Sequence, residues 1–204
     1  MNSSSLVERV FRCWFGNAKG LLENVPLEKG LMFKWFRKDD LFDSFLKSEF
    51  ASDRLALEQN QYKLSTAEER LAGIIVLDQF SRNMYRGTPE MFRLDGLALQ
   101  MAKEAIQSCI VIEHPVMRTF LYMPFMHSEE IAFQREGINL FASLYDQVKG
   151  DNLYEETVKA GFDYMKRHFD VIARFGRFPH RNVILGREPR SEETEYLING
   201  GEQF

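Results

Sequence analysis

A basic and aromatic segment near the end of the chain holds the residue types best suited to bind an anion. Residues 166–190 contain seven basic and two acidic side chains, a local charge of +5, whereas the whole chain carries a net charge of −4. Guanidinium groups bind carboxylates and phosphates through paired hydrogen bonds, and histidine can transfer protons near neutral pH. The segment therefore predicts a site for a small anionic ligand, built from Arg174, Arg177, His180, Arg181 and Asn182.

The same segment also has a purely structural interpretation. Its arginines could pair with acidic residues elsewhere in the chain and satisfy the carbonyl groups at a helix end. His168 lies between Met165 and Ile172 on one helical stripe, so it could be a histidine at the edge of the core. The sequence leaves both interpretations open.

A second polar group lies near the middle of the chain. Asp78 and Arg82 are four residues apart, as are Gln79 and Asn83, so each pair shares one face of a helix. Polar side chains on a buried helix need partners. Arg82, Asn83 and the nearby Arg86 are therefore candidates for ligand binding, and a buried structural ion pair is the alternative.

A third group surrounds His127, which we expect at a helix N-terminus, where the cationic form of histidine is disfavoured. With Glu129 nearby, His127 could act as an acid or base, or it could simply cap the helix. A zinc or iron site could combine His127, His168 and His180 with Asp78 or Glu129. However, the chain has no H-E-x-x-H motif or paired C-x-x-C motif, and the arginines disfavour a cation. We predict no metal site and can name no cofactor.

Charge and motifs argue against several functional classes. A net charge of −4 makes a general nucleic-acid binder unlikely, although the alternation of Arg and Phe at 174–178 could stack single-stranded bases. The longest apolar run, 71–77, is far shorter than the roughly 20 residues that span a membrane. No G-x-S-x-G motif supports a serine nucleophile. The isolated Cys13 and Cys109 indicate reduced thiols and, with no signal segment, a soluble cytoplasmic protein.

Helical spacing of apolar residues accounts for nearly the whole chain, and no alternating strand pattern appears. Thr66 and Glu69 have the spacing of a capping box, and Gly176 is the natural end of the helix before the basic loop. We expect one all-α domain of about eight helices over residues 1–204. The expected segments are 5–15, 32–36, a helix after Asp39, 66–84, a helix from Pro89 to 108, a helix from Pro115 that Pro124 ends or kinks, 128–148, 153–175 and 191–198, with a loop at 17–30 and Ser191 as the last cap.

Three blocks, at 77–89, 120–129 and 174–182, resemble in order and composition the domain of unknown function 924 family. The resemblance extends over nearly the whole chain and implies a compact all-helical protein with a helical-hairpin, tetratricopeptide-like arrangement. It implies no biochemical activity. The family motifs fall on Asp78, Arg82, Asn83, Tyr85, Arg86, His127, Ser128, Glu129, His168, Arg174, Arg177, His180, Arg181 and Asn182.

Our leading hypothesis is a polar pocket where the three blocks meet. We expect it to bind a small anionic ligand, with His127 and His180 as acid/base residues if the protein is an enzyme. The rival hypothesis is a non-catalytic module whose helical groove binds an acidic or extended peptide. Neither the oligomeric state nor an enzymatic reaction follows from the sequence.

Overall fold

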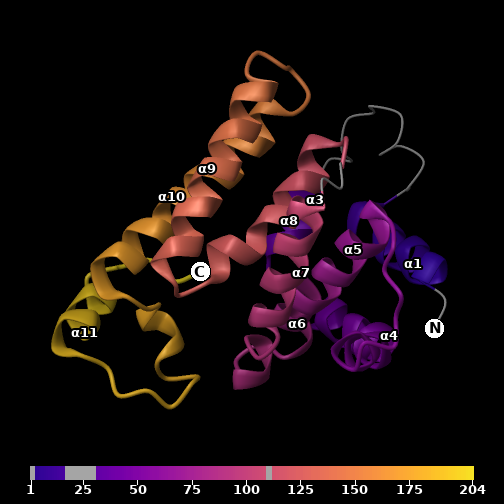
Figure 1. Cartoon of the computed structure of the whole chain (residues 1–204). Helices are drawn as coiled ribbons and strands as arrows, with labels where there is room; N and C mark the ends of the chain where they lie inside the picture. The colour runs from indigo at the N-terminus through magenta and orange to yellow at the C-terminus, as the bar shows by residue number, and fades with distance from the viewer. Residues whose placement is uncertain (1–2, 17–30, 109–111) are drawn as a thin grey trace. The chain divides into compact units, whose positions relative to one another are not determined.

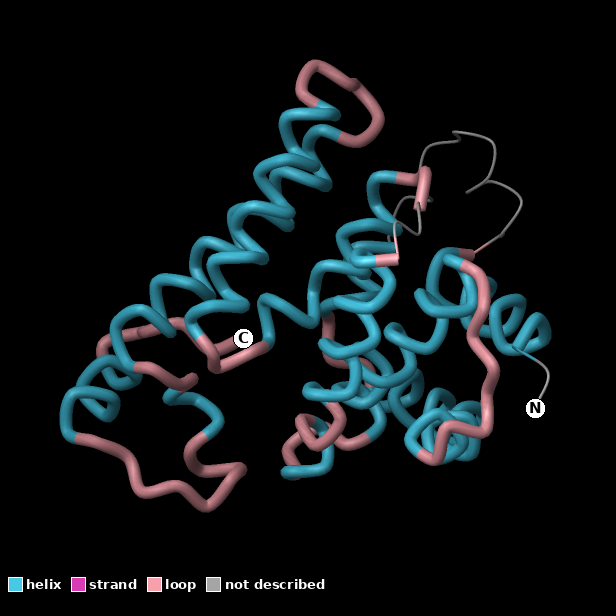
Figure 2. Tube along the Cα trace, viewed as in Figure 1, coloured by secondary structure: helices cyan, strands magenta, loops and turns pink. Residues whose placement is uncertain are grey.

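The computed structural model describes residues 3–16, 31–108 and 112–204, and all its regular elements are helical (Figure 1, Figure 2). This confirms the all-α class, whereas the tetratricopeptide-like arrangement stays a prediction. The predicted loop at 17–30 and Cys109 lie outside the described residues. Within the described ranges, no helix has the length and apolar character needed to cross a membrane.

The chain divides into two compact units. The first comprises Met1–Arg86 and Glu90–Pro124, and the second comprises Gly87–Pro89 and Phe125–Phe204. The division falls inside α8 (Pro115–His127), directly after Pro124. Proline lacks the backbone N–H that a helix interior uses, which makes it a natural boundary. The single domain expected over residues 1–204 stays a prediction.

The first unit contains an aromatic core and most of the short helices. Its rings include Trp14, which is fully buried and contacts Trp35, Phe80 and Phe120. The elements are α1 (Ser3–Phe15), α3 (Leu31–Phe36), α4 (Asp40–Glu58), α5 (Ala67–Ile74), η1 (Ile75–Phe80), α6 (Ser81–Met84), η2 (Pro89–Met91, of which Pro89 belongs to the second unit), α7 (Asp95–Gln107) and the first part of α8. Asp39 caps α4, as expected.

The helix predicted at 66–84 is present but is not α-helical throughout. Thr66 and Glu69 form the predicted capping box at its start. The segment Ile75–Phe80 is a π-helix, and all six of its residues are buried. A π-helical turn bonds each residue to the fifth one along, so it holds more residues per turn than an α-helix and changes which side chains share a face.

The second unit is built on the pair α9 (Ile131–Val148) and α10 (Glu155–Phe175), which lie side by side (Figure 1). Gly137 allows their close approach, because a methyl group there would lie 2.7 Å from the Sδ atom of Met165. At the end of α10, Gly176 adopts φ = 71°, a left-handed conformation that glycine accepts at little cost. The predicted end of this helix is confirmed.

The basic loop leaves α10 at Gly176 and leads through η3 (Pro179–Arg181) to α11 (Ser191–Ile198). Phe178 is fully buried and packs in a small core with Val171, Ile172 and Phe175. Ser191 is the first residue of α11, and Arg190 stands at the cap position where Ser191 was expected. The backbone N–H of Arg190 donates to Glu193, so a carboxylate satisfies this helix start without a serine.

Candidate functional site

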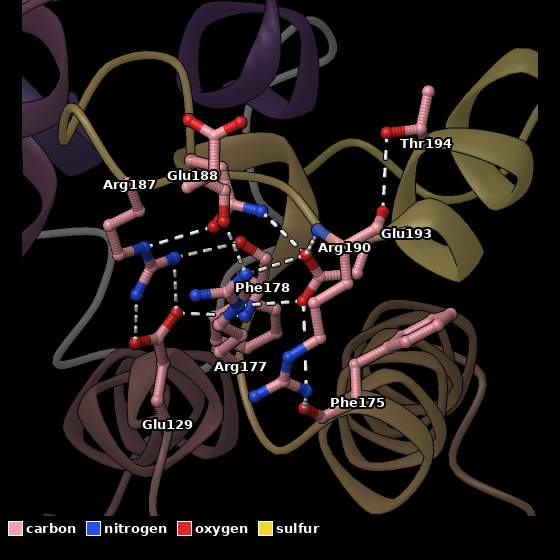
Figure 3. Close-up of polar contacts among 10 residues, drawn as sticks. Glu129, Phe175, Arg177, Phe178, Arg187, Glu188, Arg190, Glu193 and Thr194 are labelled. Atoms are coloured by element: carbon pink, nitrogen blue, oxygen red, sulfur yellow. Dashed lines mark hydrogen bonds and ion pairs between the residues drawn. The ribbon is translucent and has the colours of Figure 1, made fainter.

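The backbone of the basic loop is held by two arginine–carboxylate pairs (Figure 3). The first joins Arg177 to Glu193, with Nε donating to Oε1 at 2.6 Å and Nη2 donating to Oε2 at 2.7 Å. The Asn182 amide adds a third hydrogen bond to Glu193 at 3.0 Å. Glu193 is fully buried, and the hydrogen bond from Arg177 lowers its pKa to about 2, so the carboxylate stays charged.

The second pair joins Arg187 to Glu129 and encloses the backbone of Phe178 (Figure 3). The N–H of Phe178 donates to Glu129 Oε1 at 2.7 Å, and its carbonyl accepts from Arg187 Nη2 at 3.0 Å. Burial raises the pKa of Glu129, but the hydrogen bonds from Arg187 and Phe178 outweigh this effect and lower it overall. Both polar backbone groups of Phe178 are therefore fixed by one ion pair.

Arg174 and Arg190 lie at the outer edge of this loop. Arg190 donates to the carbonyl of Phe175 at 3.0 Å. The Arg174 guanidinium lies 4.6 Å from the Phe175 ring centre and 5.2 Å from that of Tyr196. It also lines a cavity of about 430 Å³, whose other lining residues are Glu195, Tyr196, Asn199, Gly200, Gly201 and Glu202. The two carboxylates in this cavity make it a poor match for an anion.

The ring of Phe178 belongs to a different neighbourhood, which we call the histidine cluster: His127, His168, Phe178, His180, Arg181 and Phe204. His168 is nearly fully buried, with ring centres of His127 and Phe178 at 5.9 Å and 5.6 Å. The His180 ring lies 5.7 Å from Phe178. All six residues belong to the second unit.

Arg181 joins the histidine cluster from η3 and is buried. Its guanidinium carbon lies 4.4 Å from the Phe178 ring centre, and Nη2 donates to the carbonyl of His127 at 3.1 Å. The charge of Arg181 also acts on Glu129, whose pKa it helps to lower. Arg181 thus brings a fixed positive charge to the edge of the cluster.

His168 is held in one protonation state. Its Nδ1 lies 2.8 Å from the carbonyl of Tyr164, and because a carbonyl only accepts, Nδ1 carries the hydrogen. In the neutral ring Nε2 is then a hydrogen-bond acceptor. Burial lowers the pKa of His168 well below 6.5, and the nearby His127, Arg181 and His180 lower it further. His168 is consequently a neutral base at pH 7.

His127 lies at the C-terminal end of a helix, whereas the sequence predicted a helix N-terminus there. α8 continues past Pro124 and ends at His127, and the next helix begins at Ile131 instead of near residue 128. A helix C-terminus has negative partial charge and favours a protonated histidine. The Ser128 hydroxyl accepts from the Glu130 N–H at 3.1 Å, which is a local turn contact.

The candidate residues of the middle block belong to the first unit. Arg82 pairs with Asp78, as its spacing predicted. It also forms a bidentate ion pair with Asp95, in which Nη1 donates to Oδ1 and Nη2 donates to Oδ2, each at 3.0 Å. Asn83 donates to Asp43 at 2.8 Å, and Arg86 pairs with the same carboxylate. A ligand-binding role for Arg82, Asn83 and Arg86, and a pocket shared by all three blocks, stay predictions.

The described parts of the chain contain no group of three or more His, Cys, Asp or Glu side chains placed to hold a metal ion.

Three residues that sequence reasoning left out of the site are central to its geometry, namely Arg187, Glu193 and Phe204. Glu193 had a detectable signal, because an acidic residue in the first turn of a helix can cap that helix. Phe204 had none, because a lone aromatic residue outside any helix forms no pattern.

Comparison with known proteins places the chain in a family. It matches the family described as bacterial proteins of unknown function (DUF924) over residues 10–201. A solved structure of a protein of unknown function, ATU0120 from Agrobacterium tumefaciens, is 34% identical with a TM-score of 0.74, and the match covers 98% of this chain and 100% of that one. No curated protein matches. The chain therefore belongs to the DUF924 family.

Proposed function

We propose that this DUF924 member binds a small anionic ligand at the histidine cluster of its second unit. The observation that carries the proposal is the grouping of His168, His180 and Arg181 around the ring of Phe178, with His127 beside His168. A buried neutral imidazole surrounded by groups that are cationic or can become so resists protonation, and an anion relieves that electrostatic cost.

Each residue has a distinct part in this proposal. Arg181 supplies a permanent positive charge next to Phe178. His127 and His180 are the acid/base candidates, because each can gain a proton as the anion binds. His168 takes up a proton as the anion binds and donates to it from Nε2–H, since Nδ1–H is committed to Tyr164. Arg177 and Arg187 are excluded from contact with the ligand in this proposal, because their carboxylate partners already occupy their guanidinium forks.

The test is a titration of the protein with inorganic phosphate and with acetate, followed through the NMR signals of the histidine rings. We expect phosphate to raise the pKa of His168 and to shift the signals of His127 and His180. Arg181→Gln should weaken phosphate binding by roughly tenfold, equivalent to about 1.4 kcal/mol, because it removes the fixed charge.

Arg174→Gln is the matched control, because it removes one positive charge from the same unit without touching the histidine cluster. We expect it to change phosphate binding by less than twofold. A larger loss in Arg174→Gln than in Arg181→Gln would move the site to the cavity beside α11. If neither anion shifts a histidine signal at the highest soluble concentration, the proposal is wrong.

A further inference from the structure

The cavity beside α11 is lined by charged side chains of both signs. It has a volume of about 430 Å³, and its lining includes Arg174 from α10, Glu195 from α11 and Glu202 from the segment that follows. Pockets that hold small molecules commonly have volumes of roughly 300–1,000 Å³. Glu202 is already paired with Arg167, whose Nε donates to its carboxylate at 2.7 Å. Arg174 and Glu195 are therefore the charges that the cavity offers to a ligand.

The aromatic part of the cavity lining, Tyr196, is fixed by its neighbours. A methyl group at Gly201 would lie 2.5 Å from the Tyr196 ring, so the glycine lets the chain pass directly against that ring. The N–H of Gly201 donates to the Tyr196 carbonyl at 2.9 Å, and the N–H of Glu202 donates to the Tyr196 hydroxyl at 2.8 Å. The ring also packs on Phe175, with ring centres 4.9 Å apart. This part of the cavity is thus formed in advance, which lowers the entropic cost of binding a ligand there.

The guanidinium of Arg174 lies over aromatic rings and not against a carboxylate. Its distances are 4.6 Å to the Phe175 ring centre and 5.2 Å to the Tyr196 ring centre. Among the described residues, this guanidinium forms no ion pair and no hydrogen bond. Contact with a ring uses the face of a guanidinium and leaves its N–H edge for a planar anion. Arg174 is therefore suited to bind the carboxylate of a ligand through two hydrogen bonds.

Glu195 and Asn199 supply acceptors of the opposite kind. Asn199 caps the C-terminal end of α11 four residues after Glu195, so the two side chains share one face. Within the described parts of the chain, neither side chain has a hydrogen-bond or ion-pair partner. A carboxylate beside an amide oxygen can accept from an ammonium group, which carries three N–H donors. Because Arg174 lines the same cavity without pairing with Glu195, a ligand with two opposite charges can join them.

We propose that this cavity binds a small zwitterion of the amino-acid type. The ligand's carboxylate binds Arg174, and its ammonium group binds Glu195 and Asn199. Arg167 and Arg174 balance the charges of Glu195 and Glu202, so an ion of either sign alone gains little from the cavity as a whole. The proposal is independent of the histidine cluster, whose role in binding an anion is tested by other signals.

The experiment is an NMR titration of the full chain, followed through the backbone amide signals of Gly200 and Gly201, which line the cavity. Three zwitterions increase the separation of the two charges, namely free glycine, 3-aminopropanoate and 4-aminobutanoate. Propanoate carries only the negative charge and propylammonium carries only the positive charge. We expect at least one zwitterion to bind roughly fivefold more tightly than either singly charged probe, the upper end of what an exposed ion pair contributes.

Two variants test which residue binds which charge. Arg174→Gln should weaken the binding of the best zwitterion by roughly fivefold and leave propylammonium unchanged, and Glu195→Gln should weaken the zwitterion equally and leave propanoate unchanged. The matched controls are Arg135→Gln and Glu192→Gln, which remove the same charges from exposed positions of the second unit outside the cavity lining. We expect both controls to match the wild type, and melting temperatures establish that all four variants are folded.

The wild-type titrations alone can overturn the proposal. If propanoate binds as tightly as the best zwitterion, the cavity is an anion site and Glu195 has no part in binding. If propylammonium does so, Arg174 has no part in binding. Amide signals of Gly200 and Gly201 that do not move with any zwitterion at the highest soluble concentration would show that the cavity is not a site for this class of ligand. Equal losses in Arg174→Gln and Arg135→Gln would likewise contradict a specific contact.

Discussion

The backbone and the ring of Phe178 have neighbourhoods of opposite electrostatic character. Around the backbone, each cation faces a carboxylate, as in Arg177 with Glu193 and Arg187 with Glu129. Around the ring, His127, Arg181 and His180 each lower the pKa of the buried His168. Opposite charges that satisfy each other fix a shape, whereas a buried histidine whose neighbours disfavour its protonated form responds to a bound anion. The residues that support the loop are therefore distinct from the residues of the candidate site.

The largest effect should come from breaking the buried pair on the backbone side. Glu193→Ala leaves Arg177 and the Asn182 amide without their common acceptor, and we expect it to lower the free energy of unfolding by about 3–5 kcal/mol. For a chain of this size, that loss corresponds to a fall in melting temperature on the order of 10 °C. Urea unfolding followed by circular dichroism measures it.

The neighbouring Glu192→Ala is the matched control for Glu193→Ala. Glu192 is exposed in the same helix turn, so its loss should change the free energy of unfolding by less than about 0.5 kcal/mol. The double variant Arg177→Ala, Glu193→Ala should lose less than the sum of the two single variants, because it leaves no unpaired buried charge. Equal costs for Glu192→Ala and Glu193→Ala would contradict the assignment of Glu193 as a buried support.

A smaller effect should follow from removing Arg187, whose pair is partly exposed. Arg187→Ala breaks the pair with Glu129 and removes one of the two donors to the carbonyl of Phe178, which keeps only the backbone N–H of Arg181 at 3.1 Å. We expect a loss of about 1–3 kcal/mol in the free energy of unfolding. Because the pair positions Phe178, the NMR signals of the His168 ring should shift as well. The exposed pair of Arg12 with Glu8 supplies the control, since Arg12→Ala should cost less than about 1 kcal/mol and leave His168 unchanged.

The pH dependence of the free energy of unfolding should also separate the two neighbourhoods. The pKa of His168 is lowered in the folded protein, so below about pH 6.5 the unfolded chain takes up a proton that the folded chain does not. Stability should therefore fall as the pH drops below 6.5. The pKa of Glu193 is also lowered, to about 2, so its contribution is present above about pH 4.5 and is lost as the pH falls from there toward 2.

Unfolding by urea at a series of pH values tests both steps. His168→Gln should remove part of the step near pH 6.5 and retain the acidic step. In contrast, a buffer with a high phosphate concentration should reduce the upper step in the wild type, because bound phosphate favours protonated histidines. A pH profile of His168→Gln identical to that of the wild type would show that His168 does not titrate as its burial implies.

Local patterns in the sequence predicted the local features of this fold. The capping box of Thr66 with Glu69, the pair of Asp78 with Arg82 and the helix end at Gly176 each depend on residues within a few positions of one another. The resemblance to the DUF924 family marked His127, His168 and His180 together. Their mutual proximity was a hypothesis that only the packing of α8, α10 and η3 could support.

The sequence alone could not predict features that depend on residues far apart in the chain. Arg177 meets Glu193 sixteen residues away, and Arg187 meets Glu129 fifty-eight residues away, so spacing alone could not assign these arginines to their carboxylate partners. The π-helix at Ile75–Phe80 was hidden because the run 71–77 that leads into it is apolar nearly all round, and such a run does not reveal its pitch.

That π-helix bears on how the family could tolerate insertions and deletions. Loss of one residue between Ile75 and Phe80 would let α5 continue into α6 as an ordinary α-helix, so the element itself would survive. Because a π-turn holds one residue more than an α-turn, the residues beyond the deletion would keep nearly the same direction around the helix axis. Arg82 and Asn83 would then still face Asp95 and Asp43, their partners on α7 and α4. The same loss from the α-helical part of α5 would turn every later residue of the helix by about 100° and break these pairs. The π-helical segment is therefore the part of this helix where one residue can be lost with the least damage.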